Sequence, residues 1–404
     1  MPIELTANTE PGARLVALAE QLAADFATRA ASHDREASYP FTSIDALHEA
    51  GYFAAPVPLE YGGLGVTSVH DLVVAASRLA RGDASVAIGV NMHMTVLRNI
   101  VRRWELAVAG GHERRAAAFG STLEAVALDG VVIASAVSEP GQDLTRPATT
   151  ATRTGSGWRI EGRKIFCTMS PAATVLFTAV TFTDADGVER YGYARIPTGT
   201  PGVTIHNDWD ALGMRASGSH TITFAEVELP ESALRGGFPT GSALPYIESN
   251  LTAGLFHASA SLGIAEAAQR AIIEAIVARP VAARDTRATS LLAESAMELS
   301  SARGALARSA TLIDEHYAGQ SDAEEPLVAL FAEAQATKTF VNEAATRIVD
   351  RALALSGGAG YLNGHPLARA YRDVRAGAFM HPLGANRAYE LLAEVTLGQQ
   401  PTLH

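Results

Sequence analysis

The spacing of hydrophobic residues changes twice along this 404-residue chain, and that change most constrains its fold. Up to residue 132, apolar residues recur three or four positions apart, as from Leu15 to Phe26, which is typical of amphipathic helices. From there to residue 238, β-branched residues and alternation predominate, and helical spacing then returns. We therefore expect a helical unit over residues 1–132, a β unit over 133–238 and a second helical unit over 239–404.

The first unit should contain several helices with short connections. A helix with Thr42 and Asp45 in a capping-box pattern is expected to end at Gly51, because glycine readily adopts the left-handed conformation that follows a helix. Residues 70–100 have the spacing of a further helix, and a turn-rich loop over 59–65 precedes it.

The β unit has several turn signals and one break in its alternation. Gly155–Gly157 and residues 184–187 each separate two strand-like runs, and another strand is expected over 164–168 after a further tight turn. The alternation slips by one residue near Ala225, which indicates a β-bulge. Because no helix separates these strands, we expect an antiparallel barrel or sandwich rather than a Rossmann sheet.

The last unit should be a bundle of packed helices. After the Pro- and Gly-rich stretch 235–245, one apolar residue recurs every seven positions, which fits antiparallel helices in a four-helix bundle. This seam is formed by Leu327, Ala334, Val341, Ile348 and Leu355.

Composition excludes several functions and locations. The net charge is −11 and no run of Lys or Arg interrupts it, so nucleic acid is not an expected partner. The single cysteine, Cys167, excludes an intrachain disulfide and a multi-cysteine zinc site. The sequence has neither a signal-peptide pattern nor a run of about 20 apolar residues that would span a membrane. We expect a reduced, cytoplasmic protein with no metal site and no membrane partner.

Four stretches, in this order and on suitable secondary structure, resemble motifs of the acyl-CoA dehydrogenase superfamily. They extend over most of the chain, from residue 58 to residue 375. The stretches are Leu59–Gly65 (LEYGGLG) with Arg78–Ser85 (RLARGDAS), Ser138–Asp143 (SEPGQD) with Trp158–Thr168 (WRIEGRKIFCT), Trp209–Ser219 (WDALGMRASGS) with Phe224–Pro230 (FAEVELP), and Leu355–Tyr361 (LSGGAGY) with Pro366–Arg375 (PLARAYRDVR).

The resemblance implies a flavin, usually FAD, between the β unit and the last bundle, and a homotetramer or homodimer whose subunits complete each other's cofactor sites. Donor groups at the ring would stabilise the negative charge of reduced flavin, and an aromatic side chain would shield it from water. The residues implied to bind it are Val137, Ser138, Phe166 and Thr168 at the isoalloxazine ring and Gly357, Gly358 and Gly360 at the adenosine end.

The chain departs from the family at the catalytic base. Classical members place a glutamate shortly after the RDxR motif, where it removes the α-proton of an acyl thioester while a hydride passes to flavin N5. The equivalent residue here is His381. Members that carry the glutamate on the first bundle helix have their equivalent at Ala253. Glu248, shortly upstream, is a candidate substitute, and Arg215 is a candidate basic group for a substrate phosphate.

Two motifs that bind FAD in the family are also altered. Gly-Ser-Asp after the Glu-Pro turn is shortened to Gly141-Gln142-Asp143, and the Arg-x-x-Phe-Gly motif used across the subunit interface is absent around residues 278–290. These departures imply weaker binding of the FAD adenosine, or FMN in place of FAD.

His381 has three interpretations. It could act as a general base, because an imidazole titrates near neutral pH. In an oxygenase it could hydrogen-bond an oxygen adduct of the flavin or deprotonate a substrate, as implied by the resemblance to the family's flavin monooxygenase branch. It could also be a structural residue at a helix start before Pro382, and structural roles are favoured for His257 and His93.

Three functions follow from this pattern. The first is α,β-dehydrogenation of an acyl thioester with a non-standard base. In this function the protein would pass its electrons to an electron-transfer partner. The second is a two-component monooxygenase that takes reduced flavin from a separate reductase and acts on a small organic substrate. The third is a catalytically silent paralogue that serves as a binding or assembly subunit. The fold alone does not decide between them.

Overall fold

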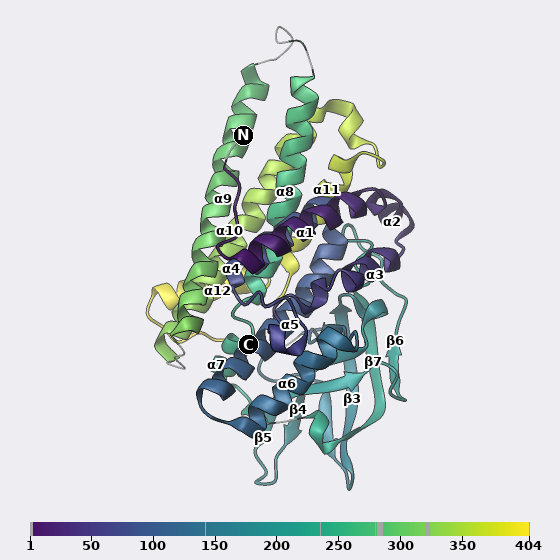
Figure 1. Ribbon diagram of the computed structural model, residues 1–404, viewed down its shortest axis with the longest axis vertical. Coiled ribbons are helices and arrows are strands. Elements are labelled where there is room, and N and C mark those ends of the chain that lie inside the picture. Colours follow the sequence, from purple (N-terminus) through teal and green to yellow (C-terminus); the bar gives the residue numbers. More distant parts are fainter. Residues whose placement is uncertain are drawn as a thin grey trace.

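The computed structural model has the expected order of helices, sheet and helices (Figure 1). It describes residues 3–403 apart from 142, 235, 279, 281–285 and 320–323. Gln142 and residues 281–285, which belong to the two altered cofactor motifs, therefore lie outside the described residues. The predicted fold class is confirmed: a helical domain, a central β domain and a C-terminal helical bundle.

The first domain is helical, as expected. Its first helix begins after Thr9, whose hydroxyl accepts the backbone N–H of Gly12 at 3.0 Å. The helices are α1 (Glu10–Ala27), α2 (Ala30–Glu36), α3 (Phe41–Glu49), α4 (Val69–Gly82), α5 (Ala84–Ala109) and α6 (Glu113–Leu128), with short 3-10 turns at Tyr52–Ala54 and Leu59–Tyr61.

Two local predictions for this domain are wrong. The capping box at Thr42 is absent because α3 begins at Phe41, directly after Pro40, and no side chain caps it. Gly51 does follow this helix with a φ of +68°. Residues 70–100 form two helices rather than one, because the carboxylate of Asp83 accepts the backbone N–H groups of Ser85 and Val86 and thereby starts α5.

The strands of the β domain form one sheet in the order β6-β7-β3-β2-β4-β5-β8, with β1 pairing β4. Their bounds are β1 (Ile133–Ala136), β2 (Thr150–Arg153), β3 (Gly157–Cys167), β4 (Val175–Thr183), β5 (Glu189–Pro197), β6 (Val203–Ile205), β7 (His220–Pro230) and β8 (Phe238–Pro239). Most pairs are antiparallel, as expected, but β1 and β2 both run parallel to β4, so the sheet is mixed.

Of the three turns and one bulge predicted for the sheet, two turns and the bulge are present. The two predicted hairpins join β2 to β3 and β4 to β5. The bulge lies beside Ala225, where Glu226 has a φ of +50° and the register of β3 and β7 shifts. The predicted turn before Lys164 is absent, because β3 continues through Gly162. Gly162 is needed for close packing and not for a turn, because a Cβ at this position would lie 2.4 Å from Oγ1 of Thr149.

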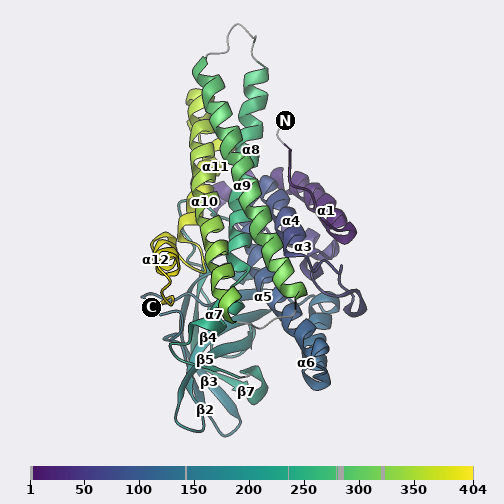
Figure 2. The ribbon, with the colours of Figure 1, turned by 90° about the vertical axis from the view of Figure 1, so that its left-hand side faces the viewer.

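The C-terminal bundle is built on three long helices that lie side by side in both ribbon views (Figures 1 and 2). Its helices are α7 (Ala243–Ser249), α8 (Ala253–Val277), α9 (Thr286–Ala318), α10 (Glu324–Ser356), α11 (Pro366–Val374) and α12 (Ala385–Thr396), with 3-10 turns η6 (Gly357–Tyr361) and η7 (Arg375–Phe379). The predicted seven-residue seam lies on α10, and its first four members are buried.

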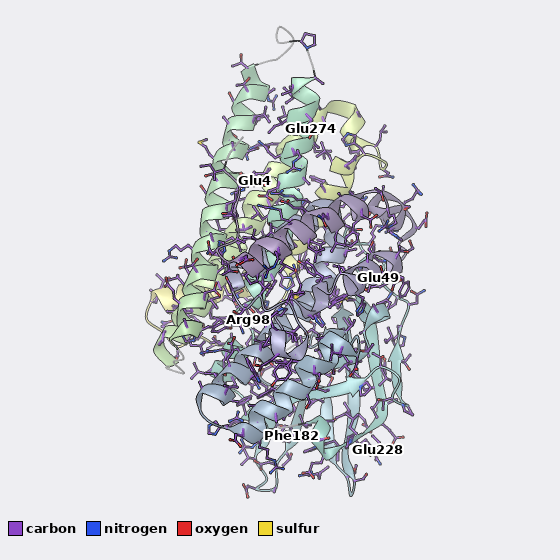
Figure 3. The ribbon with its side chains drawn as sticks, in the orientation of Figure 1. Glu4, Glu49, Arg98, Phe182, Glu228 and Glu274 are labelled. Atoms are coloured by element: carbon purple, nitrogen blue, oxygen red, sulfur yellow. The ribbon has the colours of Figure 1, made fainter. Side chains whose placement is uncertain are left out.

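The first domain and the bundle share one hydrophobic core, and the sheet has a second. At their junction, Glu266 of α8 forms ion pairs with Arg78 and Arg81 of α4 and with Arg303 of α9. Figure 3 places Arg98 of α5 between Phe182 in the sheet and Glu274 toward the tip of the bundle, so α5 passes through the centre of the molecule. No helix among the described residues is long and apolar enough to cross a membrane.

Candidate flavin and substrate cavities

A cavity of about 310 Å³, here called the central cavity, lies where the three domains meet. It is lined by residues of α5, the end of β3, the loop 209–219, α8 and the segment 372–381, and it is open to solvent beside Leu212 and Phe379. Most of its wall is apolar, and none of the described residues that line it is Asp or Glu. The polar lining residues are Ser138, Thr168, Ser217, Ser219, His257, Arg372, Arg375 and His381.

A buried ion pair holds the Ser138 side of the cavity. Lys164 Nζ lies 2.6 Å from Glu139 Oε1, and the same carboxylate accepts the backbone N–H and the hydroxyl of Thr149. Burial alone would raise the pKa of Glu139, but the Lys164 ammonium and these hydrogen bonds lower it, so the carboxyl is ionised. The carbonyl of Ser138 accepts the backbone N–H of Ile165, which fixes this turn against β3.

The end of β3 and the loop 209–219 together present an aromatic ring and a series of hydroxyls to the cavity. Phe166 has a φ of +55°, is 61% exposed and meets Trp209 edge-on with ring centroids 6.1 Å apart. The hydroxyl of Thr168 lies 2.9 Å from that of Ser219, which in turn lies 2.7 Å from that of Ser217. Donor and acceptor can exchange along this series, so it can match either kind of group on a ligand.

The loop 209–219 is held by the RDxR motif of α11. The indole N–H of Trp209 donates to the carbonyl of Met214, and the backbone N–H of Met214 donates to Asp373 at 2.6 Å. A Cβ on Gly213 would lie 2.3 Å from the carbonyl oxygen of Arg372, so only glycine fits there. Burial raises the pKa of Asp373 to about 7. These contacts explain why the LGMR and RDxR stretches occur together.

His381 is fixed in one tautomer. Its Nε2 lies 2.7 Å from the side-chain oxygen of Asn250, whose amide nitrogen donates to the carbonyl of Tyr246. An amide oxygen only accepts, so Nε2 carries the proton and Nδ1 keeps a lone pair. Burial, and then Lys338, lower the pKa of His381 to about 3, so the imidazole is neutral near pH 7.

The segment that carries His381 is held from behind by a buried lysine. Lys338 of α10 donates to the carbonyl of Met380, to that of His381 at 3.2 Å and to that of Leu383 at 2.7 Å. Lys338 is only 2% exposed, and its burial lowers the pKa of the ammonium to about 7. The lysine therefore acts through the backbone as a positioning residue for the imidazole.

Two further cavities continue from the central cavity along α5. The adjacent cavity, of about 80 Å³, shares Met92 and His381 with the central cavity. The outer cavity, of about 680 Å³, shares Asn99 and Arg103 with the adjacent cavity. Because its lining includes the exposed His112, the outer cavity reaches the surface.

The structure brings part of the predicted site together. Ser138, Phe166, Thr168 and His381 all line the central cavity. Val137 lines the adjacent cavity together with Ala253, the alternative position of the family's base.

The other predicted residues lie apart from the central cavity. Glu248 lines the outer cavity. Arg215 lines none of the three, because its guanidinium donates to the carbonyl of Asp34 at 2.8 Å and pairs with Asp210 at 3.4 Å. The glycine turn Gly357–Gly360 in η6 also lies outside the three cavities.

Sequence reasoning missed the residues that orient His381. Asn250 is 131 positions away in the chain, and the carbonyl of His381 is 43 positions from Lys338. Neither belongs to a motif, and no spacing rule connects them to the imidazole, so the sequence carried no signal for either.

The central cavity fits the ring of a flavin. Phe166 exposes a large aromatic face that α-helical or strand packing does not cover, and the hydroxyls of Thr168 and Ser219 offer hydrogen bonds to a polar edge. His257, 2% exposed, has no hydrogen-bond partner at either ring nitrogen among the described residues. An apolar wall with a few convergent polar groups suits a flat aromatic ring with donors and acceptors along its rim.

Comparisons with known proteins cover nearly the whole chain. Models of the acyl-CoA dehydrogenase N-terminal, middle and C-terminal domains match residues 13–104, 134–227 and 255–382. The amino sugar nitrososynthase DnmZ of Streptomyces peucetius is 33% identical over 97% of this chain and 95% of its own length. The putative acyl-CoA dehydrogenase YdbM of Bacillus subtilis is 30% identical over 93% of this chain and 94% of its own.

Solved structures give the same picture. KijD3 in complex with FMN and dTDP-3-amino-2,3,6-trideoxy-4-keto-3-methyl-D-glucose matches with a TM-score of 0.90 and 29% identity, over 99% of this chain and 97% of that one. The dibenzothiophene monooxygenase TdsC from Paenibacillus sp. A11-2 shares the fold. Its structure matches with a TM-score of 0.81 and 23% identity, over 97% of this chain and 99% of that one. The resemblance inferred from the motifs is thus confirmed: the chain belongs to the acyl-CoA dehydrogenase family and is a flavin-dependent oxidoreductase.

Proposed function

We propose that the protein uses reduced flavin and O₂ to oxidise the amino group of a small substrate, as a monooxygenase rather than a dehydrogenase of acyl thioesters. The lining of the central cavity carries this proposal, because it contains no carboxylate among the described residues. Desaturation needs a base that can remove a carbon-bound proton. With a pKa of about 3, His381 is poorly matched to that step.

The same lining suits an amine. Only an unprotonated amine has the lone pair that attacks an electrophilic oxygen atom. An ammonium ion would find an apolar wall and no carboxylate among the described lining residues, and it would face the guanidinium of Arg375, whereas Arg372 is paired with Asp34. Desolvation and like charge both favour the neutral amine, so the cavity should hold the substrate in its nucleophilic form.

Bound reduced flavin would supply the electrons that activate O₂, and the overall reaction R–NH₂ + O₂ + reduced flavin → R–NHOH + H₂O + oxidised flavin balances in atoms and electrons. Within the protein, Nδ1 of His381 accepts a hydrogen bond from the substrate N–H, and Asn250 maintains the tautomer that leaves Nδ1 free. The hydroxyl of Thr168 would bind the polar rim of the cofactor, and the rings of Phe166 and Trp209 would offer it apolar contact.

A nucleotide-linked amino sugar is the proposed substrate. Arg102, Arg103 and Arg115 line the outer cavity with a single carboxylate, Glu248, and guanidinium groups suit the oxygens of a diphosphate. Met92 and Arg103 are about 16 Å apart along α5, and the arginine side chain shortens that distance, so a sugar diphosphate could reach from one to the other. Support also comes from KijD3, whose complex contains a dTDP-linked amino sugar.

The test supplies the protein with flavin and a separate NADH-dependent flavin reductase in air, and follows dTDP-linked amino sugars by mass spectrometry. We expect the amino sugar to gain one oxygen atom or the nitroso group of a second cycle, and this product to be lost in His381→Ala. In a parallel anaerobic assay, saturated acyl-CoAs are added to the oxidised holoprotein. Bleaching of the visible flavin band by any of them would overturn the proposal in favour of desaturation.

Cofactor and assembly are further parts of the proposal. The cofactor is FAD or FMN, and the turn Gly357–Gly360 is proposed to complete the cofactor site of a neighbouring subunit in a homodimer or homotetramer. Support comes from Tyr361 and Leu362 beside this turn, which are 84% and 66% exposed and would be covered in such an assembly. Light scattering gives the oligomeric state, and chromatography of the extracted flavin identifies the cofactor.

A further inference from the structure

His257 is a buried side chain with unused hydrogen-bonding capacity. It lies on α8, is 2% exposed and lines the central cavity. Neither Nδ1 nor Nε2 has a hydrogen-bond partner among the described residues. Buried polar groups are nearly always hydrogen-bonded, because leaving one without a partner destabilises the fold.

His93, which is also buried in the helical core, shows what a structural role looks like. His93 Nε2 lies 3.0 Å from the carbonyl of Phe53, and its Nδ1 accepts the backbone N–H of Ile133 at 3.0 Å. Both nitrogens of His93 are thus satisfied within the protein. His257 differs from it because its side chain forms part of the wall of the central cavity and neither buried nitrogen has a protein partner among the described residues.

The surroundings of His257 keep its ring neutral. Lys338 of α10 and His381 are the titratable groups that face it, and Arg372 and Arg375 line the same cavity. Burial, then these two neighbours, hold the pKa of His257 well below its usual range. A neutral imidazole has one donor and one acceptor, which matches the mixed donors and acceptors on the rim of a flavin.

We propose that His257 is a flavin-binding residue that hydrogen-bonds the ring in the central cavity. Its place on α8 favours the cofactor over the substrate. Ala253, one turn earlier on the helix, lines the adjacent cavity, whereas His257 lines only the central cavity with Phe166 and Thr168. This inference goes beyond the proposed amine oxidation and does not depend on it, because any flavin enzyme of this family would need the ring bound.

The experiment titrates flavin-free protein with FMN and with FAD and measures Kd by flavin fluorescence, together with the Tm of the flavin-free form. His257→Leu removes an unsatisfied imidazole, so the flavin-free Tm should stay the same or rise. It also removes one hydrogen bond to the ring, so Kd should increase roughly 5- to 10-fold. His257→Asn, which keeps a donor and an acceptor, should recover part of the affinity and shift the visible flavin spectrum less than leucine does.

His93→Leu is the matched control, because it removes two hydrogen bonds that the protein makes to itself and should lower the flavin-free Tm. The inference is overturned if His257→Leu behaves like this control, with a lower Tm and an unchanged Kd, or if it changes neither quantity. If Tm and flavin affinity both fall in His257→Leu, the asparagine variant decides. A higher flavin affinity in His257→Asn than in His257→Leu supports contact with the flavin, and an equally low affinity refutes it. No substrate is present, so failure here leaves the proposed reaction untouched.

Discussion

Replacing Lys338 with methionine should change the pH dependence of stability in a way that isolates this buried lysine. Lys338 is 2% exposed, and its ammonium donates to the carbonyls of Met380, His381 and Leu383. Burial lowers its pKa from 10.5 to about 7. Methionine has a similar length and no charge, so Lys338→Met removes both the titration and the three donors while keeping most of the packed volume.

The sign follows from proton binding. Between pH 7 and pH 10.5 the lysine is protonated in the unfolded chain but largely neutral in the folded protein. The unfolded state then binds more protons, so stability rises with pH in this window, by up to about 1.4 kcal/mol per pH unit. From pH 7 to pH 9 the free energy of unfolding of the wild type should therefore increase by roughly 2 to 3 kcal/mol relative to Lys338→Met.

Urea unfolding of both proteins at pH 6, 7, 8 and 9 measures this difference in the free energy of unfolding. The hydrogen bonds lost in the variant lower its free energy of unfolding by the same amount at each pH. Parallel profiles would refute the reasoning. They would mean that the three carbonyl acceptors hold the ammonium charged throughout, so that Lys338 supports the segment of His381 as a permanent cation. In either case amine oxidation should fall more than flavin affinity, because the lysine positions the imidazole and does not line the central cavity.

The remaining predictions concern the supports of the site and its chemistry. Glu139→Gln leaves the ammonium of Lys164 buried without its partner and should destabilise the protein by about 3 to 5 kcal/mol in urea unfolding, whereas a change below 1 kcal/mol would contradict a structural role for the pair. Gly263→Ala places a Cβ 2.2 Å from a backbone carbonyl oxygen of α4 and should cost about 1 to 3 kcal/mol in the same assay. Asn250→Leu releases the tautomer of His381 and should lower kcat roughly 10- to 100-fold with little change in flavin Kd. His381→Glu supplies a counter-ion that favours the ammonium form of the substrate, so amine oxidation should require a higher pH. An unshifted pH profile of the oxidation rate would argue against control of the amine's protonation by this residue.

The features that the sequence predicted well are those set by neighbouring residues. The seven-residue seam of α10 follows from helical geometry, and the slip of alternation at Ala225 marks a true bulge because each strand residue must face one side of the sheet. The errors arose where a neighbouring residue or a distant strand pairing overrode a local pattern. Thr42 has capping-box spacing, but the chain enters α3 through Pro40, and the parallel pairing of β1 with β4 depends on a connection of about 40 residues that no local rule describes.

The candidate site was predictable only in part for the same reason. The motifs correctly placed Ser138, Phe166, Thr168 and His381 near one another, and all four line one cavity. Each of them lies in a segment whose backbone is determined by the fold. Arg215 lies outside the three cavities, where it pairs with Asp210 and the backbone of Asp34, and its role as a substrate-binding residue stays a prediction. The unsatisfied nitrogens of His257 and the contacts of Asn250 exist only in three dimensions.

The residues that hold the walls of the central cavity are different from His381, on which the proposed chemistry depends. Asp373 fixes the loop of Trp209, and Glu139 fixes the turn of Ser138, whichever residue stands at position 381. At that position a carboxylate would attract the nearby Lys338 and stay ionised as a base, whereas an imidazole beside the same cation stays unprotonated and can only accept a hydrogen bond at Nδ1. Under the proposed function, the residue at position 381 would decide whether the cavity removes a proton from carbon or keeps an amine neutral, and the supports would be the same in both cases.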